Sequence, residues 1–297
     1  MAKLGFLGLG LMGKPMAEHL LAGGHEVALW SHTSSKAQDL ANSHDGGHFC
    51  ETPAQVGAFA DCIFLCVGDS AMSEEVLTGQ DGVLSGVASE TVVADCSTIG
   101  PSTARRIAAK FESEGSHYLD SPCTGSTPGA KNGTLTFMIG GNREVFESVR
   151  PYFECMGKNL YYCGGQGMGL HAKLSQNLVL ANTLQGFVEG MVLSTKAGVP
   201  PDLMFEILDN SAAKSGLIAF KAPAVFGRNF DAAFPLKWMR KDISLMLESG
   251  RELGVPLPST SLVHELFSAG VAKGHGDEDI IAAFKMFEEL AGVVVES

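Results

Sequence analysis

Residues 3–13 read KLGFLGLGLMG, an apolar run followed by three glycines in the spacing GxGxxG. The apolar run predicts a strand, residues 12–22 have helical spacing, and EVALW at 26–30 predicts a second strand. In this context the first glycine permits a tight turn, the second admits a pyrophosphate, and the third lets the helix pack on the strand. We therefore predict nucleotide binding by Gly8, Leu9, Gly10, Leu11, Met12 and Gly13.

The end of the second predicted strand bears on the choice between NAD and NADP. An acidic residue there would bind the ribose hydroxyls and repel a 2′-phosphate. Residues 30–36 read WSHTSSK and contain no carboxylate, so hydroxyls and a cation can hold that phosphate. The segment favours NADP, and a solvated turn that tolerates both cofactors is the alternative. The candidate cofactor contacts, including one at the end of a later strand, are Ser31, His32, Thr33, Lys36 and Val67.

Strand-like and helical segments alternate through the first half of the chain. Further strand-like runs lie at 62–67, 92–95, 118–120 and 135–139, with helical spacing at 54–60, 102–114 and 143–155. This alternation predicts an α/β fold of the Rossmann type, in which helices cover both faces of a doubly wound, mostly parallel sheet.

The strand signals disappear from about Gly167 onward. Residues 170–197 contain few helix breakers and predict one interdomain helix about 40 Å long. Further helices are expected at 202–210, 236–250, 259–272 and 277–290, the last of them capped by Asp277. We place an NADP-binding domain at 1–164 and an all-α substrate and oligomerisation domain at 165–297.

Composition narrows the class of protein. The chain has 297 residues, of which 45% are hydrophobic and 18% charged, so it is long enough for two domains and too apolar for disorder. A net charge of −12 disfavours a broad nucleic-acid surface, and no apolar run reaches the roughly 20 residues of a membrane span. Seven cysteines without a CxxC pair favour a reducing cytoplasm, and the nine histidines show no metal-ligand spacing.

A lysine stands near the start of the long predicted helix. Gly167-Met168-Gly169 precedes HAKLSQN at 171–177, which puts Lys173 and Asn177 on one helix face. A lysine on an apolar helix face is usually a surface residue that extends its amine to water. The two glycines favour a functional role here, because they predict a close backbone approach that leaves room for a ligand.

Together these segments resemble the β-hydroxyacid dehydrogenase family over essentially the whole chain. The resemblance rests on GLGLMG at 8–13, DCST at 95–98, DSPCTGS at 120–126, GMGLHAKLSQN at 167–177 and the pair Lys241-Asp242. It implies hydride transfer between a nicotinamide and the carbonyl carbon of a small acid, with members assembled as dimers or tetramers. The apolar long helix also favours a homodimer or homotetramer, since a monomer would expose it.

The resemblance also implies roles for individual residues. Lys173 matches the catalytic lysine, which would donate a proton to the alkoxide that hydride addition creates. Asn177 matches an asparagine that orients the substrate, and Thr98 matches a threonine that contacts the cofactor. Lys241 matches a lysine that closes over cofactor and substrate. The alternative interpretation of Lys241 is an ordinary charge on a helix surface. Thr124, Gly125 and Ser126 match the loop that binds the substrate carboxylate in the family.

Several positions depart from the family pattern. Ser126 stands where a glycine is usual, Thr124 replaces a serine, and Gln176 replaces the first of two asparagines. Cys123 occupies the place of a small aliphatic residue and is interpreted as filler rather than as a nucleophile. These departures change the shape of the substrate pocket and therefore the identity of the substrate, not the reaction.

Two other functions compete with a dehydrogenase. An imine reductase or amine-forming reductase on the same scaffold is disfavoured by Lys173, which such relatives typically lack. A non-catalytic NADP-binding module is disfavoured because Lys173, Asn177 and Lys241 are all present.

Overall fold

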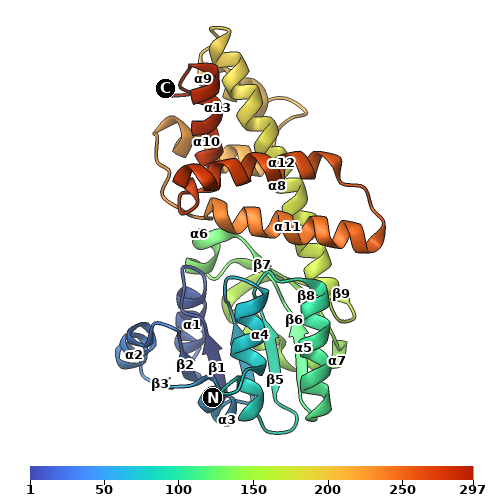
Figure 1. The fold of residues 1–297 in the computed structure, drawn as a ribbon. Coiled ribbons are helices and arrows are strands. Elements are labelled where there is room, and N and C mark those ends of the chain that lie inside the picture. Colours follow the sequence, from blue (N-terminus) through green and yellow to red (C-terminus); the bar gives the residue numbers. More distant parts are fainter. Residues whose placement is uncertain (297) are drawn as a thin grey trace. The chain divides into compact units, whose positions relative to one another are not determined.

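The computed structural model describes residues 1–296, which form two compact units (Figure 1). The first unit is Met1–Lys173 and the second begins at Leu174, so the division falls inside one long helix. We retain residues 164–165 as the proposed domain boundary, because a glycine-rich turn there separates the last strand from that helix.

The first unit is built on a nine-stranded sheet in the order β3-β2-β1-β4-β5-β6-β8-β7, with β9 also paired to β8. Its first six strands are parallel, whereas β8 runs antiparallel to β6 and β7 and parallel to β9. The strands are β1 (Lys3–Leu7), β2 (Glu26–Trp30), β3 (Gly47–Phe49), β4 (Cys62–Leu65), β5 (Val92–Asp95), β6 (His117–Asp120), β7 (Cys123–Thr124), β8 (Leu135–Gly140) and β9 (Gly157–Gly164). The predicted Rossmann-type, mostly parallel sheet is confirmed.

Helices cover both faces of this sheet because successive strand residues point to opposite sides. Phe6 and Phe64 pack with α1 and α7, while Ile63 and Leu65 pack with α3, α4 and α5. The strands are therefore apolar on both faces, as parallel strands buried between two helical layers must be. The helices are α1 (Gly13–Ala22), α2 (Ser34–Ser43), α3 (Pro53–Phe59), α4 (Ser70–Thr78), α5 (Pro101–Ser113), α6 (Ser126–Lys131) and α7 (Arg143–Met156), with a 3₁₀ turn η1 (Val83–Ser85).

The second unit is entirely helical in its regular structure. The long helix α8 (Met168–Lys196) enters it, and its residues Leu184, Val188 and Met191 lie in the core of this unit. The other elements are α9 (Pro201–Asp209), α10 (Gly216–Phe226), α11 (Leu236–Leu253), α12 (Pro258–Gly270), the π-helical turn η2 (Val271–His275), the 3₁₀ turn η3 (Ile280–Ala282) and α13 (Ala283–Ala291). The predicted all-α second half is confirmed.

A buried ion pair holds the start of α11 in this unit. The Lys221 ammonium lies 2.6 and 2.7 Å from the two Asp279 carboxylate oxygens, and the same carboxylate accepts hydrogen bonds from the backbone N–H groups of Ala233, Phe234 and Ile281. Because a buried charge is tolerated only when it is paired and hydrogen-bonded, this carboxylate fixes the loop before α11 against the turn before α13.

The predictions for the end of the chain need correction, and some elements were missed. Asp277 caps no helix: it pairs with Lys237, and Asp279 caps η3 instead. The single helix expected at 277–290 is η3 followed by α13, and the one expected at 259–272 ends at Gly270 before η2. The strand β9 and the helix α10 were missed, since Pro223 inside α10 and the polar start of β9 weaken their patterns.

No helix among residues 1–296 has the length and apolarity needed to cross a membrane.

Candidate functional site

The candidate cofactor residues of the first unit gather along one edge of the sheet. Gly8 follows β1, Ser31 follows β2, Val67 follows β4 and Thr98 follows β5. These strands are parallel neighbours, so their carboxyl ends meet at the same edge. The chain winds outward in opposite directions from β1 and β4, and open α/β sheets bind ligands at that switch point.

The three glycines of the loop are required for different reasons. A side chain at Gly8 (φ +92°) would place its Cβ 2.2 Å from the Cys66 carbonyl oxygen, and one at Gly13 would lie 1.9 Å from the Gly8 carbonyl oxygen. Gly10 has no atom within 4 Å of the corresponding position. The outer two glycines therefore allow backbone packing, and the middle one leaves open space where a pyrophosphate can approach the N-terminus of α1.

The segment after β2 presents exposed polar side chains. Ser31 is buried, whereas His32, Thr33 and Lys36 are exposed around the start of α2. Thr33 stands at the N-cap of that helix without a side-chain hydrogen bond to it. The hydroxyl of Thr33 is thus not used to cap α2, and the segment presents hydroxyl, imidazole and ammonium groups with no carboxylate among them.

A buried carboxylate organises the loops after β4 and β5. Asp95 accepts hydrogen bonds from the Ser97 N–H (2.9 Å) and the Tyr118 hydroxyl (3.1 Å), and the Ser97 hydroxyl accepts one from the Val67 N–H (2.9 Å). Burial raises the pKa of Asp95 above its ordinary value, and these hydrogen bonds oppose the rise. The network joins the segments that carry Val67 and Thr98.

A second buried carboxylate, Asp120 at the end of β6, caps helix α8. Its two oxygens accept hydrogen bonds from the N–H groups of Gly167 (2.7 Å) and Leu170 (2.9 Å). Burial raises the pKa of Asp120 to about 6, and the two N–H groups oppose that rise. Lys173, buried to 6% exposure, lies one helical turn beyond this cap. Asp120 therefore fixes the end of the helix that carries Lys173.

The close backbone approach predicted at the glycines is confirmed at Gly169, but it leaves no room for a ligand at that position. A Cβ there would lie 2.3 Å from the Met138 carbonyl oxygen and 2.6 Å from that of Asp120. The glycine instead lets the first turn of α8 pack directly on the backbone of the sheet.

The predicted carboxylate loop lies between β7 and α6. Gly125 (φ +129°) and Ser126 (φ +54°) both have positive φ, a conformation that a serine adopts at an energetic cost. Burial raises the pKa of the neighbouring Cys123 thiol to about 11, and the positive charge of Lys173 opposes that rise. The Lys173 ammonium is thus close enough to act on this loop, and a thiol with so high a pKa supports the interpretation of Cys123 as filler.

In the second unit, a third buried carboxylate connects two candidate residues. The Asn177 amide donates a 2.8 Å hydrogen bond to Oδ2 of Asp242, and the Lys241 ammonium lies 2.8 Å from Oδ1. Asn177 is 1% exposed and Asp242 is 2% exposed, whereas the Lys241 side chain is 17% exposed. A long-range contact between α8 and α11 therefore unites residues that lie 64 positions apart in the sequence.

The sequence interpretation missed the importance of Asp95, Asp120 and Asp242. All three lie inside or beside the quoted motifs DCST, DSPCTGS and the Lys241-Asp242 pair. The available signal was an acidic residue directly at the end of an apolar strand, or on the apolar face of a helix, where a carboxylate needs partners. Within residues 1–296, no group of three or more His, Cys, Asp or Glu side chains is arranged to hold a metal ion.

Two family models match the chain in succession. Residues 3–165 match the NAD binding domain of 6-phosphogluconate dehydrogenase, and residues 167–287 match the NAD-binding model of NADP-dependent 3-hydroxyisobutyrate dehydrogenase.

Full-length relatives agree with these models. The chain is 36% identical to 2-(hydroxymethyl)glutarate dehydrogenase of Eubacterium barkeri over 294 residues, covering 99% of this chain and 97% of that one. It is 34% identical over 289 residues to 2-hydroxy-3-oxopropionate reductase of Escherichia coli (strain K12), covering 97% and 98%. A solved structure of Mycobacterium tuberculosis 3-hydroxyisobutyrate dehydrogenase with L-serine has a TM-score of 0.88 and 28% identity, covering 96% and 99%.

Proposed function

The chain belongs to the NAD(P)-binding β-hydroxyacid dehydrogenase family, that of 3-hydroxyisobutyrate dehydrogenase, and on this premise we propose an NADPH-preferring reductase of a small, carboxylate-bearing aldehyde or keto acid. In the reverse direction it is a hydroxyacid dehydrogenase. The relatives' names support this class, since 2-(hydroxymethyl)glutarate and 2-hydroxy-3-oxopropionate each combine a carboxylate with a hydroxyl or carbonyl group.

Lys173 is the proton donor and acceptor of the proposed reaction. The observation that carries this role is a buried ammonium, one turn beyond the capped end of α8, whose charge acts on the loop at Cys123. Reduction of a carbonyl leaves an alkoxide, and a positioned ammonium stabilises that charge and then donates its proton. A capped, buried helix end gives the amine a fixed position, which this step requires.

The glycine loop holds the nicotinamide cofactor in this proposal, which fits the open space at Gly10 beside the N-terminus of α1. The bound cofactor supplies the hydride for reduction. Val67 and Thr98 border its site at the ends of β4 and β5. NADP is preferred because the start of α2 offers the hydroxyl of Thr33 and the ammonium of Lys36 to a 2′-phosphate without an opposing carboxylate.

The substrate carboxylate binds the turn at Thr124, Gly125 and Ser126, where hydroxyl and N–H groups can donate to it. Asn177 orients the substrate, and its amide is itself oriented by Asp242. Lys241 donates to the anionic substrate or cofactor in this proposal, since its side chain remains 17% exposed while its ammonium is held by Asp242.

We further propose a homodimer or homotetramer in a reducing cytoplasm. Val179 and Leu193 on α8 are 63% and 73% exposed, and contact with another subunit along this helix would remove their apolar surface from water. All seven cysteines are free thiols, as a reducing compartment requires.

The test is a panel of carboxylate-bearing and uncharged aldehydes, with NADPH and NADH each supplied as the reductant. The panel includes glyoxylate, succinic semialdehyde, tartronate semialdehyde and a cyclic imine, and its reverse arm includes 3-hydroxyisobutyrate and 3-hydroxypropionate. We expect turnover of at least one acid, with NADPH giving the higher kcat/KM. Turnover of cyclic imines but of no carbonyl acid would instead establish an imine reductase, and the absence of all turnover would leave a binding module.

A further inference from the structure

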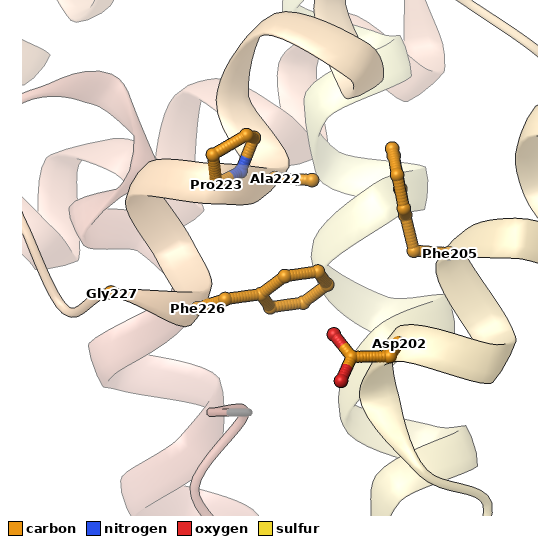
Figure 2. A pocket seen from close by; sticks show the side chains of 6 residues that line it. All are labelled: Asp202, Phe205, Ala222, Pro223, Phe226 and Gly227. Carbon is orange, nitrogen blue, oxygen red and sulfur yellow. The ribbon is translucent and has the colours of Figure 1, made fainter.

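A pocket in the second unit lies apart from the residues assigned to the reaction. It has a volume of about 400 Å³, within the range of small-molecule sites. Its walls come from α9, from α10 and from the residue that follows α10: Asp202, Phe205, Ala222, Pro223, Phe226 and Gly227 (Figure 2). Asn177 lies near the opposite end of α8, roughly 28 Å along the helix from Lys196 at 1.5 Å per residue, and α9 begins shortly after Lys196. The pocket is therefore separate from the Asn177–Asp242–Lys241 cluster of the same unit.

Two aromatic rings form the apolar part of this pocket. The ring centroids of Phe205 and Phe226 are 6.0 Å apart and their planes are 83° apart, an edge-to-face arrangement. Figure 2 shows both rings directed toward the space that the Asp202 carboxylate also faces. Aromatic faces carry partial negative charge and attract cations, more strongly when part of the cation is removed from water.

The charge of the lining sets the ligand class. Asp202 is the one charged residue among the six that line the pocket, and the whole chain carries a net charge of −12. An anionic ligand would be repelled, and a neutral apolar ligand would gain nothing from the exposed, hydrated Asp202 carboxylate. A positively charged group with an apolar body satisfies both the rings and the carboxylate.

We propose that the α9–α10 pocket binds a small organic ammonium ion, with its cationic head at Asp202 and its apolar body against Phe205 and Phe226. Ala222 and Pro223 close the apolar side without adding polar groups. Because the pocket lies away from the proposed substrate residues of this unit, its ligand does not compete with the carbonyl acid.

The test is a binding titration of the full-length protein with three probes of similar size: benzyltrimethylammonium, benzyl alcohol and phenylacetate. Saturation-transfer NMR measures binding of each probe. We expect benzyltrimethylammonium to bind more tightly than benzyl alcohol by about fivefold or more, and phenylacetate not to bind at this site. NADPH and a substrate acid at saturating concentration leave the affinity for the ammonium probe unchanged.

Matched variants locate the bound probe. Asp202→Asn weakens benzyltrimethylammonium binding by about fivefold, whereas Glu206→Gln, an equal loss of charge at an exposed position on the same helix, leaves it unchanged. Phe226→Leu weakens all binding at the pocket, with the melting temperature confirming that the variant is folded.

Three results would overturn the proposal: equal binding of the neutral and ammonium probes, equal weakening by the two charge variants, or displacement of the probe by substrate. A fourth result, failure of every probe to bind, would also overturn it. Dissociation of an oligomer by Asp202→Lys would then assign the pocket to contact with a second copy of the chain.

Discussion

Buried carboxylates organise both units, but they act on different partners. In the first unit, Asp95 and Asp120 hold mainly backbone N–H groups at the ends of strands and at the start of α8. In the second unit, the carboxylate beside the candidate residues, Asp242, holds the side chains of Asn177 and Lys241. Asp279, elsewhere in that unit, pairs with Lys221 and also accepts hydrogen bonds from backbone N–H groups. A backbone contact survives most changes in the residue that supplies it, whereas a side-chain contact depends on both identities. In the first unit these carboxylates thus fix where loops lie, and in the second Asp242 fixes how the Asn177 and Lys241 side chains are held.

The largest expected effect is at Lys173. This residue lies on α8, the helix that Asp120 caps and that also carries Asn177, the partner of Asp242. Lys173→Ala should lower kcat by roughly 10²–10⁴-fold, because the alkoxide loses its positioned proton donor. The KM for NADPH should change little. Lys173→Arg is the matched control, since it keeps the positive charge but has no proton that it readily gives up. Steady-state kinetics measures both, and full activity in either variant would remove Lys173 from the mechanism.

Asp242→Ala tests whether Asn177 and Lys241 depend on their common contact with Asp242. The substitution leaves a buried amide and an ammonium without their shared acceptor, so kcat/KM should fall by about tenfold or more and stability by about 1–3 kcal/mol. A double-mutant cycle with Asn177→Ala should be strongly non-additive. Additive losses would show that the two residues act independently, and would end the proposed orienting role of Asp242.

Asp120 allows the pH dependence of the first unit to be predicted. The carboxyl group has a pKa of about 6 in the folded chain, raised from 3.8, so the folded state binds its proton more tightly than the unfolded state does. Stability from this group is therefore fully present below about pH 4 and is lost as the pH rises through 6. The corresponding free energy is about 3 kcal/mol.

Chemical unfolding from pH 4 to pH 7 checks this prediction. The free energy of unfolding of the unmodified chain should fall, relative to that of Asp120→Asn, as the pH rises across this range. The other titrating groups contribute equally to both proteins and cancel in the comparison. The prediction is contradicted if the free energy of unfolding of the unmodified chain minus that of Asp120→Asn stays constant or rises with pH.

Lys36→Ala tests the cofactor preference proposed for the start of α2. Loss of this exposed charge should raise the KM for NADPH by about fivefold and leave the KM for NADH unchanged, because only NADPH carries the 2′-phosphate. The effect should shrink as salt is added. Lys158→Ala, a loss of charge at an exposed position in β9, serves as the control and should alter neither constant.

Ser126→Gly should produce the smallest change. Glycine removes the steric strain at φ +54° but adds freedom to the unfolded chain, so stability should change by less than about 1 kcal/mol. The KM for the acid substrate should rise severalfold if the hydroxyl contacts the carboxylate. An unchanged KM across the substrate panel would show that the side chain at 126 does not select the substrate.

The sequence alone determined those features that depend on neighbouring residues. The loop at 8–13, the alternation of strands and helices, and the long helix that became α8 all follow from local periodicity and turn chemistry, which act over a few residues. The candidate residues Lys173 and Asn177 could be placed on one face for the same reason. Local signals failed where a competing partner existed, as at Asp277, which pairs with Lys237 rather than capping a helix. They also failed where a proline or polar residues weakened the pattern, as in α10 and β9.

Only the tertiary structure decided which buried groups are partners. Asp120 reaches the start of α8 from 47 residues away, Asp242 reaches Asn177 from 65 residues away, and Asp279 reaches Lys221 from 58. No local pattern specifies such pairs, because a buried carboxylate can be satisfied by any correctly placed donor, and the fold determines which donors are near. The same holds for the pocket between α9 and α10, whose rings and carboxylate face a shared space only after the helices pack.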